Sequence, residues 1–437
     1  MKSSTLFFLF ATLAASGGIA QSLEWQDPRT LAAAAVEASP SIRALEAEAE
    51  AAREAARAAG ALPNPMAMGG VQNLNEDLTN DMMMTMYMVG ASQSFVPGER
   101  RRSLERAAEA SVKGVEATQR TLAAEVSRDA IVAWIEIASI DERREIVERV
   151  LSVTDAIVAS SRARYEAGSA IQADILRAQL VRSDLQHTIL SLEGDRRIAA
   201  ATLRSLLGLE AGTEIPRLHL REASPSAPPS PIITEEHPGI ASLQAEVDRR
   251  TAEIDLARSA TRPAWSVEAS YGYRPEANGM ISVLGKVELP LRRKDLIEPR
   301  IREAIARRDA ARQRIEEVRR SLTEQAAIAS AVLDQAVSQL AFHEQVLVPQ
   351  AKLAFDSTLA AYQTARADFE ALLGSESAYV RLATDYYDYL ERALEAQADL
   401  VALQQGARTI RVGAAGVRMS GNASAPAGAS SPAMGPM

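Results

Sequence analysis

The chain has 437 residues, 4% of them aromatic, a formal net charge of −9 and no cysteine. The negative balance argues against a nucleic-acid-binding protein, because contact with phosphates needs a concentrated basic face. Without cysteine, we expect neither a disulfide nor a lipid anchor on an N-terminal cysteine. Usage rich in Ala, Glu, Arg and Leu is typical of long helices and coiled coils rather than of a large spherical core.

Residues 1–20 are predicted to form a secretory signal peptide. A lysine precedes an apolar run from Leu6 to Ala15, and small residues precede Gln21, so cleavage is expected after Ala20. The apolar run is too short to span a bilayer, and no later segment reaches a spanning length. We therefore expect an exported chain without a membrane helix.

Residues 21–212 are predicted to form a first structural repeat. A helix from about Pro28 to Gly60 precedes a β-hairpin at 66–95, which ends at "VPG". Apolar residues at steps of three and four then predict a long helix to about Tyr165 and a returning helix to the end of the repeat. The two long helices should form an antiparallel hairpin with its tip near 166–170.

A linker rich in Pro and Ser, predicted at 213–237, separates this repeat from a second one at 238–411. The second repeat has the same order of elements. Its β-hairpin is predicted at 264–289 and its helical tip near 363–368. The tail at 412–437, rich in Gly, Ala, Ser and Pro, is predicted to be disordered.

Two distant landmarks support the duplication. Tyr165 and Tyr362 are 197 positions apart, and Pro65 and Pro263 are 198 positions apart. A helix of about 65 residues is about 100 Å long, so such hairpins would be far longer than a globular domain. Helical spacing alone is equally consistent with an exported soluble coiled-coil scaffold.

The strand segments distinguish these interpretations. Over 265–273, Trp, Val, Ala and Tyr occupy alternate positions, with Ser, Glu and Gly between them, and 281–289 repeat this pattern. Residues 84–95 alternate similarly, whereas 66–74 alternate poorly. Such alternation over about ten residues is typical of outer-membrane barrel strands, although a half-buried strand of a soluble hairpin also shows it. Aromatic residues at the strand ends would suit the headgroup level.

Four strands cannot close a barrel, and lipid does not tolerate an open strand edge. Strands that enter a membrane must therefore be pooled by several chains. Three copies would supply twelve strands, so the β interpretation predicts a homotrimer in contact with outer-membrane lipid.

The order of elements and several motifs resemble the TolC family of outer-membrane efflux channels, over roughly residues 25–411. The resemblance rests on "LPNP" (62–65), "SQSFVPGERR" (92–101), "RYEAGSAIQADILRAQL" (164–180), "LRSLLGL" (203–209), "HPGI" (237–240) and "VLVPQAKLAFDSTLAAYQ" (346–363). It implies a mainly α chain with a small β part. Long antiparallel coiled-coil helices would form a periplasmic α-helical barrel, and four strands per chain would join a shared 12-stranded transmembrane β-barrel in a trimer. It also implies a periplasmic adaptor and an inner-membrane RND pump as partners.

In this family the glycine-marked turn is the periplasmic tip of each helical hairpin, which constricts the channel and docks the adaptor. The resemblance assigns this role to Tyr165, Gly168, Ser169, Asp174, Leu176 and Tyr362. Glycine suits a tight turn because it tolerates positive φ. At the second tip, Ala365 stands where Gly168 does and Ala371 where Asp174 does, which leaves the geometry of that turn open.

Arg366, Asp368 and Glu370 are the candidate pore-gate residues. In a trimer the two carboxylates would form a ring that favours cations and resists closure, unless Arg366 or a bound ion bridged it. Ordinary solvated charges at a turn are the alternative interpretation.

The segment "NDMMMTMYMVGASQSF" (80–95) contains five of the 12 methionines and resembles the heavy-metal branch of the family, which serves copper and silver exporters of the RND type. Thioethers are soft ligands for Cu(I) and Ag(I), and the alternation places Met84, Met86 and Met88 opposite the apolar face. Methionine also fills apolar space without a metal, so these three are weak candidates. No resident metal or cofactor is predicted.

Residues for catalysis are not recognisable. The four histidines are not paired at metal-ligand spacing, and no phosphate-binding loop or nucleophile elbow occurs. The sequence therefore predicts a non-enzymatic channel that passively conducts substrate, such as copper or silver cations, from adaptor and pump to the exterior. A periplasmic adaptor is a further alternative, but it would carry one helical hairpin rather than two in tandem.

Overall fold

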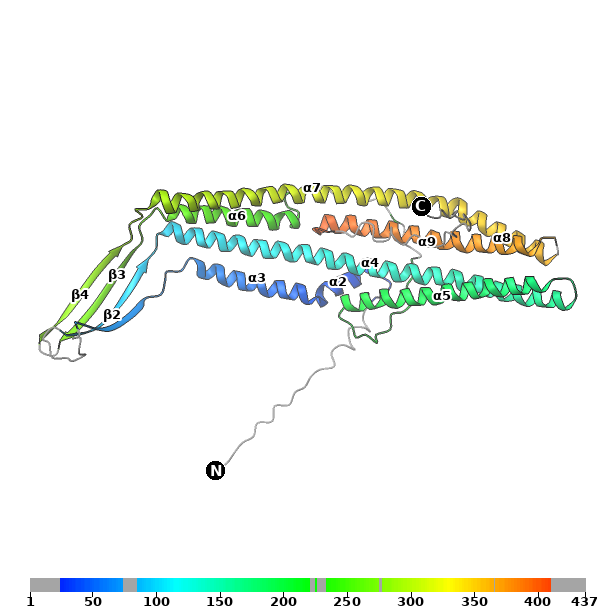
Figure 1. Cartoon of the computed structure of the whole chain (residues 1–437), viewed down its shortest axis with the longest axis horizontal. Helices are drawn as coiled ribbons and strands as arrows, with labels where there is room; N and C mark the ends of the chain where they lie inside the picture. The colour runs from blue at the N-terminus through cyan, green and yellow to red at the C-terminus, as the bar shows by residue number, and fades with distance from the viewer. Residues whose placement is uncertain are drawn as a thin grey trace, which may run out of the picture.

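The computed structural model describes residues 24–73, 85–220, 225, 233–274, 277–364 and 366–409. The predicted signal peptide, the predicted tail, part of the predicted linker and Met84 lie outside these residues. The described chain is mainly helical with one four-stranded sheet, which confirms the predicted fold class. The sheet lies at one end of the long helices and both helical turns lie at the other (Figure 1).

The first half contains, in chain order, α2 (Pro28–Ala38), α3 (Pro40–Ala59), β1 (Met66–Gln72), β2 (Met86–Phe95), α4 (Gly98–Glu166) and α5 (Gln172–Leu206). The single helix expected from Pro28 to Gly60 is divided at Ser39, whose backbone is extended (φ −65°, ψ 117°). Pro40 explains this break, because proline disfavours helical backbone in the residue before it. With 69 residues, α4 is about 100 Å long.

The second half contains α6 (Pro238–Ser259), β3 (Trp265–Arg274), β4 (Ala277–Val287), η1 (Arg293–Ile297), α7 (Glu298–Phe342), η2 (His343–Leu347), α8 (Val348–Gln363) and α9 (Phe369–Gln405). The two η elements are single π turns, which the sequence pattern did not predict. Each lies just before a proline, Pro299 or Pro349. Because proline cannot donate the next helical hydrogen bond, the turn before it is a natural place for the helix to widen.

The four strands pair in the order β1-β2-β3-β4, and every pair is antiparallel. The pairing of β2 with β3 joins the two halves of the chain, with Tyr87 opposite Tyr273 and Phe95 opposite Trp265. Within the described chain, β1 and β4 each have one edge unpaired. The sheet of one chain is therefore open at both sides.

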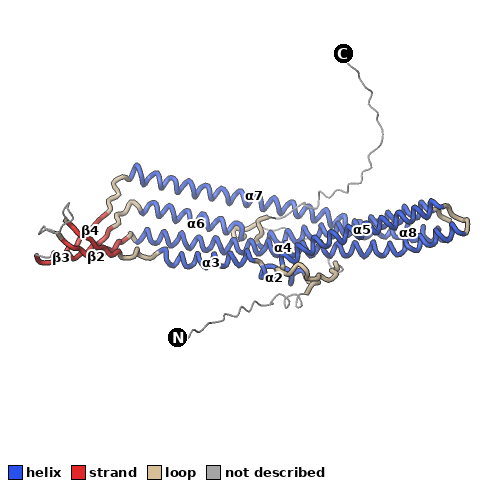
Figure 2. The backbone as a smooth tube through the Cα atoms, turned by 60° about the horizontal axis from the view of Figure 1, so that its bottom comes forward, coloured by secondary structure: helices blue, strands red, loops and turns tan. Residues whose placement is uncertain are grey.

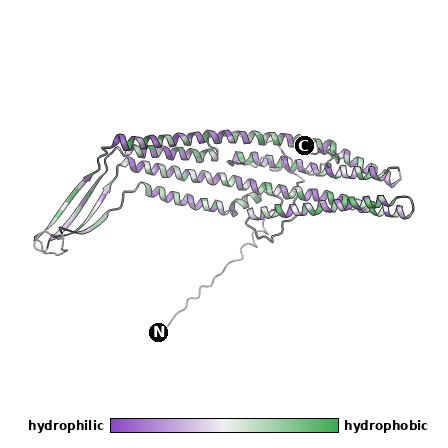
Figure 3. Ribbon diagram, in the orientation of Figure 1, coloured by the Kyte–Doolittle hydropathy of each residue, from purple (hydrophilic) through white to green (hydrophobic). Residues whose placement is uncertain are grey.

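The long helix α4 is the centre of the helical part, since it packs along α3, α5, α6 and α9. Figure 2 shows α3 and α6 running beside it. The largest buried cluster includes Ile137, Ile140, Leu203 and Leu218, beside many alanines that let the helices approach closely. Polar and apolar residues are mixed along every helix (Figure 3). None of the described helices is both long enough and apolar enough to cross a bilayer.

Candidate functional site: the helical tips and the sheet

At the first tip, between α4 and α5, Gly168 takes up the left-handed backbone conformation, with φ at +72°. This lets the Ser169 N–H donate to the Arg164 carbonyl at 2.8 Å, and the Ser169 hydroxyl donates to the same carbonyl at 3.0 Å. Such a bond from the residue beyond a left-handed glycine is a helix C-cap that closes a tight turn. Gly168 and Ser169 thus have the turn-forming role that the sequence predicts for them.

The second tip, between α8 and α9, closes with the same hydrogen bond. The Arg366 N–H donates to the Ala361 carbonyl at 2.8 Å, and both residues lie 197 positions after the pair at the first tip. Ala365 itself lies outside the described residues. The residues before and after position 365 therefore form the same closing hydrogen bond as at the first tip, although the sequence has alanine there instead of glycine.

The three candidate gate residues have different environments. Asp368 is the N-cap of α9, since its Oδ1 accepts a hydrogen bond from the Ala371 N–H at 2.9 Å. Glu370 forms an ion pair with Arg177 of α5, with Nη1 and Oε1 2.7 Å apart. Arg366 is exposed at the turn. Helix capping and an ion pair between hairpins therefore account for both carboxylates within one chain.

Tyr362 is the residue at which the two hairpins meet. Its side chain is buried, and the guanidinium of Arg164 lies 4.7 Å from its ring centroid. Arg164 Nη1 also donates to the Tyr362 carbonyl at 3.3 Å, and the Ser161 and Tyr362 hydroxyls lie 3.3 Å apart. Phe369 covers another side of the ring, at 5.7 Å between centroids. The sequence indicated Tyr362 but none of these partners, because they lie on separate helices.

The first tip exposes several large apolar side chains among charged ones such as Glu166 and Arg177. Its large exposed side chains are Tyr165, Ile171, Leu176 and Leu180. Asp174 is half-buried in the first turn of α5. Exposed apolar side chains gathered at one end of a molecule are typical of a docking surface. Tyr165, Asp174 and Leu176, for which the sequence predicts a docking role, thus lie together at this tip, with Ile171 and Leu180 as exposed apolar neighbours.

A buried carboxyl group lies between the hairpins. Glu376 of α9 is 1% exposed and lies against Thr154 of α4, while its Oε2 has no hydrogen-bond partner in the described chain. The Thr154 hydroxyl lies within hydrogen-bond distance of both Glu376 and the Val150 carbonyl. Burial raises the pKa of Glu376 above its usual value.

One face of the sheet is apolar and exposed. On β3, the side chains at 265, 267, 269, 271 and 273 are exposed, while those between them are less so, as the alternation predicts. Phe95 stacks on Trp265 at 4.1 Å between centroids, at the end of the sheet nearest the helices. Tyr271 and Tyr273 lie near the other end, and eight residues of strand cover about 27 Å. This is close to the height of the apolar band of an outer-membrane barrel, about 25 Å.

The opposite face of the sheet is mixed polar and thioether-rich. Met86 is buried, Met88 is half-buried, and Lys286 pairs with Glu268 at 2.6 Å across β3 and β4. The strand register adds Met68 and Met280 to this face. A Cβ at Gly272 would collide with Met86 Sδ, so a larger residue there would displace the Met86 side chain. The structure therefore places two of the three predicted methionines opposite the apolar face.

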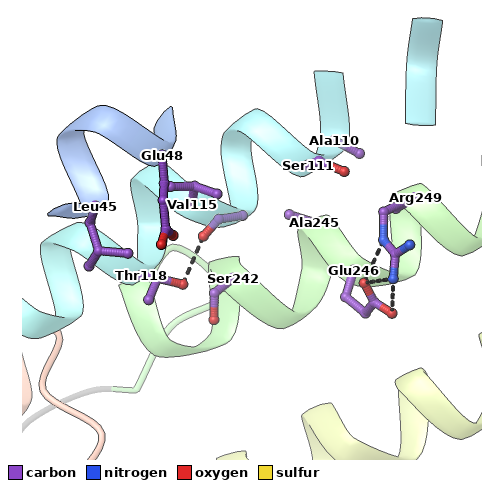
Figure 4. A pocket seen from close by; sticks show the side chains of 11 residues that line it. Leu45, Glu48, Ala110, Ser111, Val115, Thr118, Ser242, Ala245, Glu246 and Arg249 are labelled. Atoms are coloured by element: carbon purple, nitrogen blue, oxygen red, sulfur yellow. Dashed lines mark hydrogen bonds and ion pairs between the residues drawn. The ribbon is translucent and has the colours of Figure 1, made fainter. Parts of the chain in front are cut away.

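A shallow groove of about 350 Å³ lies where α3, α4 and α6 meet (Figure 4). Small residues such as Ala110, Gly114 and Ala245 line it. Of its three charged residues, Glu246 and Arg249 pair with each other at 2.6 Å, and Glu48 is the third. The groove is a consequence of close helix packing and shows no constellation for catalysis.

Two long helical hairpins at one end and a sheet with an exposed apolar face at the other define the fold of an outer-membrane channel subunit. A family model described as outer membrane efflux protein matches residues 31–209. Over these residues the chain matches the outer membrane efflux protein family, which agrees with the resemblance found in the sequence. The family is one of efflux proteins and not of enzymes.

Known proteins similar to this chain agree with that assignment. The cobalt-zinc-cadmium resistance protein CzcC of Cupriavidus metallidurans is 22% identical over 342 residues, covering 77% of this chain and 79% of CzcC. The nickel-cobalt-cadmium resistance protein NccC of Alcaligenes xylosoxydans xylosoxydans is 24% identical over 334 residues, covering 75% and 76%. The solved structure of the outer-membrane channel OprN has the same fold, with a TM-score of 0.73 at 16% identity over 88% of this chain and 91% of OprN.

Proposed function

We propose that this chain is one of three identical subunits of an outer-membrane channel that passively conducts heavy-metal cations to the exterior. The observation that carries the proposal is the sheet, whose apolar face is exposed and whose two edges are unpaired within the chain. Unpaired edges are costly in lipid, so the strands need further copies to close a barrel. Three chains supply twelve strands, an even number typical of such barrels.

The partners in this proposal are a periplasmic adaptor and an inner-membrane RND pump. The exposed apolar surface of the first tip supports an adaptor-docking role, because it lies at the end farthest from the sheet. Tyr362 is buried between the hairpins, so it positions the second tip rather than offering its ring to the adaptor. Arg366 and the Arg177–Glu370 ion pair are the gate candidates that the geometry supports best.

The cargo that we infer is divalent cations such as cobalt, zinc, cadmium or nickel. The printed names of the two curated relatives support these metals. Copper and silver, expected from the methionines, are supported only by the thioether-rich face of the sheet. Both groups of metals belong in the test.

The first experiment is fractionation of the expressed chain, followed by sizing of the detergent extract. The proposal expects a trimer from the outer membrane, and a deletion strain that is sensitised to divalent cations more than to copper and silver. A monomer or dimer in the soluble periplasmic fraction would instead support the coiled-coil scaffold. Sensitisation to copper and silver alone would overturn the divalent cargo but not the channel.

Adaptor docking has its own test. Leu176→Arg places a charge on the first-tip surface and should abolish co-purification of the adaptor with trimers of normal size. Leu190→Arg is the matched control, because Leu190 is also an exposed leucine of α5 but lies away from the turn. Equal loss with both variants would contradict docking at the tip.

A further inference from the structure

Three potential metal ligands meet about two thirds of the way along α4, away from the tips and the sheet. The carboxylates of Glu142 and Glu145 and the imidazole of His219 have ligand atoms within 4.8 Å of one another. Glu142 Oε1 and His219 Nδ1 are 3.2 Å apart. The two glutamates are three residues apart on α4 and so lie on the same side of the helix. The histidine comes from the segment after α5, 74 positions beyond Glu145. A local spacing of ligands in the sequence therefore does not predict the cluster.

The backbone around His219 is held firmly against α4. Its neighbours Leu218 and Leu220 are both buried. The Leu218 N–H donates to Asp141 Oδ2 at 3.1 Å, and the Leu220 N–H donates to Glu142 Oε1 at 3.3 Å. In an extended segment, side chains alternate between its two sides. Burial of both leucines therefore leaves the intervening His219 imidazole beside the glutamates instead of in the core.

Glu142 also has the outer support that a ligand carboxylate needs. The Tyr387 hydroxyl donates to Glu142 Oε2 at 3.1 Å. Hydrogen bonds of this kind fix the orientation of a ligand carboxylate and strengthen metal binding. Glu142 is itself buried, whereas Glu145 and His219 are partly exposed, so an ion can enter from solvent.

Charged groups of both signs surround the three ligands. Asp141, next to Glu142, is already paired with Arg196 at 2.6 Å. The Arg149 guanidinium reaches Glu145 only at 3.8 Å, a long distance for an ion pair. A divalent ion held by the three groups would bring positive charge to the two carboxylates.

We propose that Glu142, Glu145 and His219 form a binding site for one divalent cation of the zinc class, which fastens the segment after α5 to α4. Two carboxylate oxygens and one imidazole nitrogen suit zinc and cobalt, whereas Cu(I) and Ag(I) prefer sulfur, and calcium and magnesium prefer oxygen alone. Three protein ligands leave a fourth position for water. Binding requires the ligand atoms to move closer, to about 3.5 Å apart around a tetrahedral ion. Glu145 and His219 are partly exposed, so their side chains have room for this movement.

The site is tested by titrating the purified full-length protein in detergent with Co²⁺ and following its visible absorption, with Zn²⁺ as competitor. We expect one tight Co²⁺ per chain with the intense absorption of low coordination number, displaced by Zn²⁺. His219→Ala and Glu145→Gln should each weaken binding at least about tenfold. His187→Ala is the matched control, because His187 is an exposed histidine of α5 outside the cluster.

Two results would overturn the proposal: no tight Co²⁺ binding by the wild-type protein, or equal affinity in wild type, His219→Ala and Glu145→Gln. Unfolding is checked by the helical circular dichroism and the oligomer size of each variant. A second readout is proteolysis of the segment at 213–220, which zinc should slow in the wild type and not in His219→Ala. The site does not depend on the proposed cargo, since binding by the purified chain is measured without transport.

Discussion

The two helical tips share a backbone closure but differ in their surroundings. Tyr165 and Tyr362 are related by the 197-residue offset, yet the Tyr165 side chain is 46% exposed and that of Tyr362 is 5% exposed. The same offset relates Gln179, which is half-buried, to Glu376, which is buried. The second hairpin packs against α4 of the first. The related sequences thus form the same turn at both tips. Which tyrosine is buried depends instead on how the second hairpin packs against α4.

This asymmetry has a functional side. Within one chain, the first tip keeps its apolar residues on the surface, where another copy or an adaptor can reach them. The second tip instead uses its aromatic residues to hold the two hairpins together. Four substitutions test this division of labour.

Tyr362→Ala should have the largest effect. Loss of a buried aromatic ring costs about 3 kcal/mol or more, whereas Tyr165→Ala removes an exposed ring and should cost less than about 1 kcal/mol. Hydrogen exchange of amides in peptides that cover each tip measures both local opening free energies. Similar changes at the two tips would show that they are equivalent in solution.

Glu376→Gln should change the pH dependence of the second hairpin. The pKa of Glu376 is raised in the packed state by burial, so packing takes up a proton. Stability of the packed tip is then full below the usual glutamate pKa and falls as pH rises toward the raised value. The glutamine variant should lose this dependence and be more stable at neutral pH by about 1 kcal/mol, because its neutral amide avoids a buried charge.

The measurement is amide exchange at the second tip under mildly acidic and mildly alkaline conditions, corrected for intrinsic exchange rates. Glu370→Gln is the control, since Glu370 is an exposed carboxyl group at the same tip. An unchanged pH dependence in Glu376→Gln would refute the assignment to this residue.

Arg164→Ala should cost about 1 kcal/mol at the second tip, through loss of the cation–π contact and the hydrogen bond to the Tyr362 carbonyl. Arg162→Ala is the control, because Arg162 is an exposed arginine on the same turn of α4. A double-mutant cycle with Tyr362→Ala isolates the coupling. A coupling energy near zero would mean that Arg164 does not stabilise the tip through its contact with Tyr362.

Arg177→Ala should have the smallest effect. Both partners of the Arg177–Glu370 pair are exposed, and such pairs contribute at most about 0.5 to 1 kcal/mol. The coupling energy in a cycle with Glu370→Gln should fall as salt is added. A larger, salt-independent coupling would mark this pair as buried in the assembled protein.

Much of the architecture could be predicted from local patterns. Helical spacing gave the long helices, and the alternation over 265–273 gave the face of β3 that is exposed. The break at Ser39 was predictable in principle, because Pro40 is a visible signal. The π turns before Pro299 and Pro349 were harder, since proline in a helix permits several local solutions.

The side-chain partners at the site could not be found in this way. Arg164 and Tyr362, or Arg177 and Glu370, are almost 200 positions apart, so only the packing of one hairpin on the other brings them together. His219 lacked ligand spacing in the sequence and meets Glu142 only in the fold. The periodicity of apolar residues predicts which face of a helix or strand a residue occupies. It does not predict which residues of other elements pack against that face.

The pairing of β2 with β3 constrains how the protein is made. Strand β2 ends at Phe95, while its partner β3 begins at Trp265, after α4, α5, a linker and α6 have been synthesised. Until β3 has been synthesised, the edge of β2 that pairs with it has no partner strand. Contacts of such large sequence separation form slowly and expose aggregation-prone edges meanwhile. The β3-pairing edge of β2 therefore stays open until the second half of the chain has been synthesised.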